Sequence, residues 1–169
     1  EFPEDAFIVS TVGFMIPWKC HAEIAESLSA WLLEDPSVYL QVIASEHFNE
    51  SLKGHAEECR LRLRRLADRF GQDRVRHVDG YPSDQELIDR LSLSDLGYVW
   101  CPFDTASSSA AAAQFITAKC PLVASASTHY DSMGDGVLRA EKTDVAGFGR
   151  LIRKTAQNRG LLKKLRAGQ

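Results

Sequence analysis

Short apolar segments alternate with longer amphipathic segments along most of this chain, and this alternation restricts the fold more than any other feature. The apolar segments are β-branched or continuously apolar, which is typical of strands buried on both faces of a sheet. The expected strands are residues 7–12, 38–44, 75–78, 96–101 and 121–124, with residues 137–140 as a further candidate.

The segments between these strands carry apolar residues at helical spacing. Ser83 and Glu86 form a capping-box pattern at the start of one helix, and Gly71 is a helix stop signal after another. The expected helices are residues 22–33, 55–70, 84–92, 107–118 and 145–165, the last with a break near Gly160. Alternating strands and helices predict a doubly wound, Rossmann-like α/β parallel sheet with helices on both faces, forming one domain over residues 1–169.

Composition excludes several classes of protein. The net charge of −3 argues against bulk electrostatic binding of nucleic acid, so no nucleic-acid partner is expected. No apolar run approaches the roughly 20 residues of a membrane span. The acidic N-terminus does not resemble a signal peptide and has no starting Met, which indicates a cytoplasmic protein and a fragment of a longer chain. The arginine-rich helix 55–70 also carries acids, which favours a solvated face over a basic site.

The four cysteines lack metal-binding spacing. No C-x-x-C pair is present, and no histidine stands at ligand spacing from Cys20, Cys59, Cys101 or Cys120. We therefore expect four reduced, mostly buried thiols and no metal site.

In sheets of this class, ligands bind beyond the carboxyl ends of the strands, near the point where the strand order reverses. This rule directs attention to the loops at residues 13–20, 44–52, 79–83 and 102–109. Gly13 allows a sharp turn after the first strand, and Lys19 precedes a helix, where it can meet a phosphate group. The alternative for Lys19 is a solvated side chain.

The loop at residues 102–109 ends in three serines. Ser107, Ser108 and Ser109 offer hydroxyls and free backbone N–H groups that suit a phosphate or diphosphate, although one of them would suffice as a helix cap. Tyr81, which follows Gly80, could stack on a base or cover the edge of the core. No nucleophile elbow or Ser-His-Asp set is visible, so no catalytic residue is identified, His21 and His129 included.

Together, these motifs resemble the C-terminal, donor-binding domain of retaining GT-B glycosyltransferases (group 1, family 4-like). The resemblance begins at residues 9–13 with Pro17-Trp18-Lys19 and continues through residues 75–81 and 93–96. It ends at residues 118–125, Ala-Lys-Cys-Pro-Leu-Val-Ala-Ser, which are similar to the family's A-x-G-x-P-V-V-A-S. The motifs keep the family's order and spacing over nearly the whole chain.

The resemblance implies a nucleotide-sugar donor (a UDP-, GDP- or ADP-sugar) as substrate and no separate cofactor. It places Lys19 on the phosphates, Gly80 and Tyr81 against the base, and Gln114 near the ribose. The residues at the helix that points at the diphosphate are Ser107, Ser108 and Ser109.

Four positions depart from the family pattern. Phe14 replaces an arginine and Cys20 a glycine, while Ala106 and Gln114 stand where the family has two glutamates.

Three functions follow as hypotheses. The first is the donor-binding half of a polysaccharide or glycolipid hexosyltransferase, inactive without the N-terminal acceptor-binding domain of the full-length chain. The second is a non-catalytic scaffold domain that offers Phe14, Met15, Ile16 and Trp18 as an exposed apolar patch. The third, ranked last, is an unrelated flavodoxin-like or receiver-like module, because the first strand lacks the acidic cluster of a receiver domain.

Overall fold

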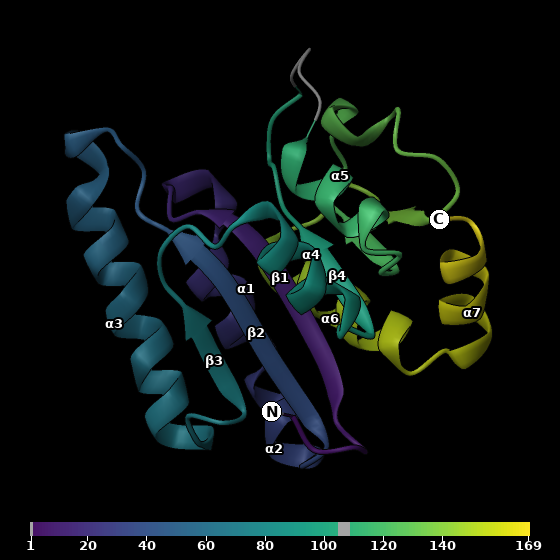
Figure 1. The fold of residues 1–169 in the computed structure, drawn as a ribbon, viewed down its shortest axis with the longest axis horizontal. Helices are drawn as coiled ribbons and strands as arrows, with labels where there is room; N and C mark the ends of the chain where they lie inside the picture. Colours follow the sequence, from purple (N-terminus) through teal and green to yellow (C-terminus); the bar gives the residue numbers. More distant parts are fainter. Residues whose placement is uncertain (1, 105–108) are drawn as a thin grey trace.

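A computed structural model describes residues 2–104 and 109–169 as a six-stranded parallel sheet with the strand order β3-β2-β1-β4-β5-β6 (Figure 1). β2 and β3 follow β1 toward one edge of the sheet, whereas β5 and β6 follow β4 toward the other edge. This reversal at the junction of β1 and β4 confirms the predicted doubly wound sheet. The strands are β1 (Phe7–Phe14), β2 (Val38–Ser45), β3 (Val75–Val78), β4 (Leu96–Val99), β5 (Leu122–Ala124) and β6 (Val137–Arg139).

Helices cover both faces of the sheet, as predicted. In Figure 1, α4 and α5 lie in front of the sheet, and α1, α2 and α6 lie behind it. The helices are α1 (His21–Ser27), α2 (Ser29–Glu34), α3 (Lys53–Phe70), α4 (Asp84–Ser92), α5 (Ala110–Thr117), α6 (Val145–Ala156) and α7 (Arg159–Ala167). Short 3-10 turns occupy Pro17–Lys19, Glu50–Leu52 and Thr128–Tyr130.

The sheet separates two apolar cores, because successive residues of a strand point to opposite faces. In β4, Tyr98 joins the core beneath α1, α2, α3 and α6, whereas Val99 joins the core beneath α4 and α5. Phe148 of α6 is fully buried in the first core, and Phe115 of α5 is fully buried in the second. The helices that follow β1 and β4 therefore leave the sheet on opposite faces.

Two predicted helices are each divided in the structure. The segment predicted at 22–33 breaks at Leu28, which has φ −89° and ψ −1°, and the Ser27 hydroxyl donates to the Ile24 carbonyl just before it. The segment predicted at 145–165 ends at Ala156, and Asn158 caps the next helix by accepting from the Leu161 N–H. The second break therefore lies at residues 157–158, close to the break predicted near Gly160.

The elements around the fourth loop are shorter than predicted. The strand predicted at 96–101 ends at Val99, and the helix predicted at 107–118 begins at Ala110, with Ser109 as its cap. Residues 105–108 lie outside the described part of the chain. The four cysteines agree with the prediction: none is in a disulfide, and Cys59, Cys101 and Cys120 are buried.

Replacing Gly97 by alanine is expected to destabilise the fold. A Cβ atom at Gly97 would lie 2.5 Å from the ring of Phe115, and this ring is fully buried and cannot easily move. Overpacking of this kind costs about 1–3 kcal/mol in the free energy of unfolding, which urea titration would measure. Gly54→Ala is the matched control, because no atom lies within 4 Å of the position that its Cβ would take and α3 should gain stability. Equal effects of the two substitutions would contradict this packing.

Candidate functional site

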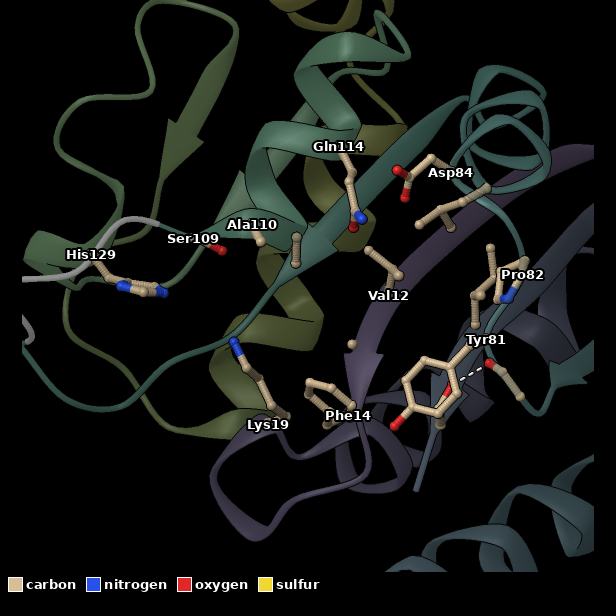
Figure 2. Close-up of a pocket in the computed structure, with 16 residues that line it drawn as sticks. Val12, Phe14, Lys19, Tyr81, Pro82, Asp84, Ser109, Ala110, Gln114 and His129 are labelled. Atoms are coloured by element: carbon tan, nitrogen blue, oxygen red, sulfur yellow. Dashed lines mark hydrogen bonds between the residues drawn. The ribbon is translucent and has the colours of Figure 1, made fainter. Parts of the chain in front are cut away.

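A pocket of about 320 Å³ lies at the carboxyl ends of the strands and beside the first turn of α5 (Figure 2). The end of β1, the turn after it, the loop after β3 and the start of α5 all contribute to its wall. Its lining residues are Val12, Gly13, Phe14, Lys19, Ile43, Ser45, Gly80, Tyr81, Pro82, Asp84, Leu87, Ser109, Ala110, Ala111, Gln114 and His129. The pocket is therefore where the fold predicts a ligand.

Six of the eight predicted site residues line this pocket. They are Gly13, Lys19, Gly80, Tyr81, Ser109 and Gln114. Ser107 and Ser108 lie outside the described residues. Six residues that are distant in the sequence thus line one pocket, and their role toward a ligand is taken up under Proposed function.

Gly13 makes the turn that opens the pocket. Its φ of +148° is a conformation that other residues rarely adopt, and a Cβ there would lie 3.5 Å from Nε2 of His21. The same His21 Nε2 lies 3.2 Å from the Phe14 carbonyl oxygen. A carbonyl can only accept, so Nε2 donates and ties α1 to the end of β1.

His21 is buried in its neutral form. Burial and, second, the positive charge of Lys19 lower the pKa of His21 to about 3. Among the described residues, none hydrogen bonds to its Nδ1. His21 thus acts here as a structural support for the first loop, a role that the sequence did not reveal.

Lys19 places an uncompensated positive charge at the pocket. Within the described part of the chain, no carboxylate lies within ion-pair distance of its ammonium group. Burial lowers the pKa of Lys19, and the neighbouring Cys101 opposes this shift. In Figure 2, the Lys19 amine extends from the first loop toward Ser109 and Ala110 at the start of α5. An anion bound between them would meet both the ammonium and the helix N-terminus.

Ser109 serves first as the cap of α5. Its side chain is almost fully buried, and its oxygen accepts from the Ala112 N–H at 3.2 Å. The N-capping alternative is therefore correct for this serine, whose hydroxyl hydrogen remains able to donate.

Hydrogen bonds also join the loops that follow β4 and β5. The Ser125 hydroxyl bridges the N–H and the carbonyl of Cys101 at 2.8 Å each. Ser127 donates to the Phe103 carbonyl at 2.5 Å, and the Thr128 N–H donates to Asp104 at 3.0 Å. These bonds fix the chain immediately before the segment 105–108.

Aromatic rings form the opposite rim. Tyr81 is 68% exposed, yet its hydroxyl donates to the Glu46 carbonyl at 2.5 Å, which fixes the ring at the mouth of the pocket. The Phe14 ring meets Tyr81 edge to face at 5.7 Å and His47 at 4.9 Å between centroids. The Ser45 hydroxyl donates to the Gly80 carbonyl and joins β2 to the same rim (Figure 2).

Arg60 of α3 forms ion pairs with the two loops that carry this rim. It pairs with Asp79 at 2.7 Å and with Glu46 at 3.1 Å, so it links α3 to the loops after β2 and β3. Arg62 pairs with Glu23 and Glu26 of α1. Two arginines of this helix therefore make ion pairs between elements, whereas Arg64, Arg65 and Arg69 are exposed as predicted.

Gln114 and Asp84 are further polar residues that line the pocket. Gln114 is the neutral one of the two. It points from α5 into the cavity in Figure 2, and no described residue hydrogen bonds to its amide. A cation, a free amide, a helix N-terminus and a rim of planar rings can together hold an anion joined to a polar, ring-bearing group.

Among residues 2–104 and 109–169, no group of three or more His, Cys, Asp or Glu side chains is placed to hold a metal ion.

One predicted surface is wrong. Met15 is fully buried in the core beneath α1, α2, α3 and α6, and Ile16 is 6% exposed. The Met15 N–H continues the pairing of β1 with β2 by donating to the Ser45 carbonyl at 2.8 Å. Trp18 is 40% exposed, but an apolar patch with Met15 and Ile16 does not form.

Over the described residues, no helix has the length and apolarity to cross a membrane.

Comparison with known proteins identifies the fold. No protein-family model and no curated protein matches the sequence. Among solved structures, a UDP-forming α,α-trehalose-phosphate synthase from Burkholderia xenovorans is similar with a TM-score of 0.79 and 18% identity, over 97% of this chain and 40% of that one. HepE from Anabaena, solved in complex with UDP and glucose, has a TM-score of 0.73 and 13% identity, over 97% of this chain and 42% of that one.

The α,α-trehalose 6-phosphate synthase of Burkholderia multivorans is also similar, with a TM-score of 0.77 and 18% identity, over 95% of this chain and 37% of that one. The chain thus spans about two fifths of the length of the solved chains it matches. The predicted resemblance to a GT-B glycosyltransferase domain is confirmed at the level of the fold.

The neutral state of His21 predicts a pH dependence of stability. The unfolded chain takes up a proton on His21 near pH 6.5, whereas the folded chain does not until about pH 3. Stability therefore falls as pH decreases below about 6.5, by about 2 kcal/mol at pH 5 relative to pH 7. Urea titrations at both pH values would measure this loss, and His21→Gln should reduce it while keeping a donor for the Phe14 carbonyl. An equal loss in the variant would contradict the assignment.

Proposed function

We propose that this domain binds the nucleoside diphosphate part of a nucleotide sugar and forms the donor-binding half of a retaining hexosyltransferase. The observation that carries the proposal is the position of Lys19, an unpaired and partly buried cation that faces the start of α5 across the pocket at the strand-order switch. A diphosphate supplies the charge that this arrangement lacks.

The rest of the pocket suits a nucleoside. Tyr81 and Phe14 offer ring faces and edges beside the loop that carries Gly80, where a base can stack. Gln114 can donate and accept hydrogen bonds with ribose hydroxyls. A UDP-, GDP- or ADP-sugar meets these requirements, and the HepE structure with UDP-glucose supports the choice of class by analogy of fold.

In this proposal the domain stabilises the leaving group of the transfer. Negative charge grows on the diphosphate as its bond to the sugar breaks, and Lys19 with the α5 N-terminus would stabilise that charge. The acceptor, a glycan or glycolipid, would be held by an N-terminal domain of the full-length chain, because the similar solved chains are about two and a half times longer.

The alternative function, a non-catalytic scaffold domain, was based on an exposed apolar patch that the structure does not contain among the described residues. Met15 and Ile16 lie in the core, so the proposed partner-binding patch is absent from the described residues. Donor binding is therefore the function that we put forward.

Binding of UDP, GDP and ADP by calorimetry tests the proposal directly. We expect a dissociation constant below about 1 mM for at least one of them, and a loss of at least about tenfold in Lys19→Ala, because an unpaired charge-assisted contact is worth about 1.5–3 kcal/mol. Lys142→Ala is the control, since Lys142 is exposed and lies outside the pocket. Absence of binding of all three nucleotides at millimolar concentration would overturn the proposal.

In this proposal, Lys19 marks the phosphate end of the pocket and Gln114 the ribose end. Substitutions at the two ends should therefore affect UDP and pyrophosphate differently. Gln114→Ala should weaken UDP binding about threefold to tenfold, because one neutral hydrogen bond contributes about 0.5–1.5 kcal/mol, and should leave pyrophosphate binding unchanged. Lys19→Ala should weaken both ligands. Competition calorimetry with the two ligands would measure this pattern, and a loss of pyrophosphate binding in Gln114→Ala would contradict the assigned ends.

A further inference from the structure

The C-terminal part of the chain has a charge opposite to that of the rest. Residues 145–169 contain seven lysines and arginines and no aspartate or glutamate. Residues 1–144 contain 13 basic and 23 acidic residues. The net charge of −3 therefore conceals a strongly basic end, which the donor pocket does not use.

Most of these cations are exposed and unpaired. Arg153 pairs with Glu34 of α2. The other six are exposed on α6 and α7 and make no ion pair with any described residue. We call these six residues the basic face: Arg150, Lys154, Arg159, Lys163, Lys164 and Arg166.

The α7 part of the basic face lines a groove. Arg159, Lys163 and Arg166 recur at the spacing of one helix side, and with Leu162 they line a groove of about 440 Å³ against Asp95. The Asp95 carboxylate accepts from the Ile8 N–H at 2.9 Å, so it is already engaged in the sheet.

This groove lies away from the donor pocket. Asp95 directly precedes β4, so the groove is at the amino edge of the sheet, whereas the pocket is at the carboxyl edge. Figure 1 places α7 on the β6 side of the sheet, far from α3. A ligand on the basic face would leave the pocket open.

We propose that the basic face binds the surface of an anionic lipid bilayer. A cluster of exposed lysines and arginines on an amphipathic helix is typical of segments that bind anionic lipid. Leu162 packs against the core beneath α6, so the apolar residues that remain partly exposed beside these cations are Leu161 of α7 and Leu93, which is 62% exposed and stands two residues before Asp95. Charge and apolar side chains thus occur together at one edge of the molecule.

A bilayer fits these features better than a nucleic acid does. Binding of single strands relies on exposed aromatic rings, whereas the one aromatic residue of α6 and α7, Phe148, is fully buried. The acidic remainder of the chain would repel a phosphate backbone that extends past the basic face. A flat bilayer contacts one side only, and the charge asymmetry orients the domain on it.

Co-sedimentation with vesicles tests the proposal. The 169-residue chain is expected to bind vesicles that contain about one third phosphatidylserine and not vesicles of phosphatidylcholine alone. Binding should decrease strongly when NaCl is raised from about 0.1 M to about 0.5 M, because the attraction is electrostatic.

Two triple variants, each lacking three positive charges, show whether vesicle binding depends on the basic face or only on the net charge of the chain. Lys163→Gln, Lys164→Gln and Arg166→Gln together should weaken vesicle binding roughly a hundredfold, at about fivefold for each cation. The control combines Arg64→Gln, Arg65→Gln and Arg69→Gln on α3, all exposed and outside the basic face. The control should bind vesicles within about threefold of the parent chain.

Three outcomes would overturn the proposal: no binding to the anionic vesicles, equal loss in both triple variants, or tighter binding to duplex DNA or RNA than to the vesicles. Circular dichroism would establish that both variants fold. Nucleotide binding should be unchanged in the α7 variant, so failure here is distinguishable from failure of the proposed donor site.

Discussion

The central position of β1 determines where a ligand can bind. β1 pairs in parallel with β2 along all eight of its residues and with β4 through Val9 and Ser10, so strands extend from it in both directions. The helix after β1 packs on one face of the sheet, and the helix after β4 packs on the other. The loops that lead to these two helices therefore separate at the carboxyl edge, and the pocket lies in the space between them.

The walls of this pocket are held by contacts that do not require a ligand. His21 supports the Phe14 carbonyl, Ser45 and Arg60 hold the rim, and Ser125 with Ser127 joins the loops after β4 and β5. Lys19 and Gln114 have no such partners within the described chain. The pocket groups left without partners in the described chain thus include a cation, an amide and the Asp84 carboxylate, which together suit a charged, hydroxyl-bearing ligand.

Much of the architecture could be predicted because buried strands and amphipathic helices have different apolar periods. Breaks inside helices could not be placed this way, since Leu28 continues the apolar pattern while leaving the helix geometry. Met15 and Ile16 are buried by tertiary packing, which no local pattern indicates. Cys20 has a left-handed backbone, with φ 51°, a conformation that its residue type does not predict.

The central claim is that the pocket between the first loop and α5 binds a nucleoside diphosphate. NMR titration of the isotopically labelled chain with UDP, GDP or ADP tests it at every backbone amide. We predict shifts that saturate and concentrate at residues 13–19, 80–82 and 109–114, with the Lys19 amide among the most affected. Saturating shifts confined to another surface, such as the amino edge beside Asp95, or no shifts at millimolar nucleotide, would contradict the account.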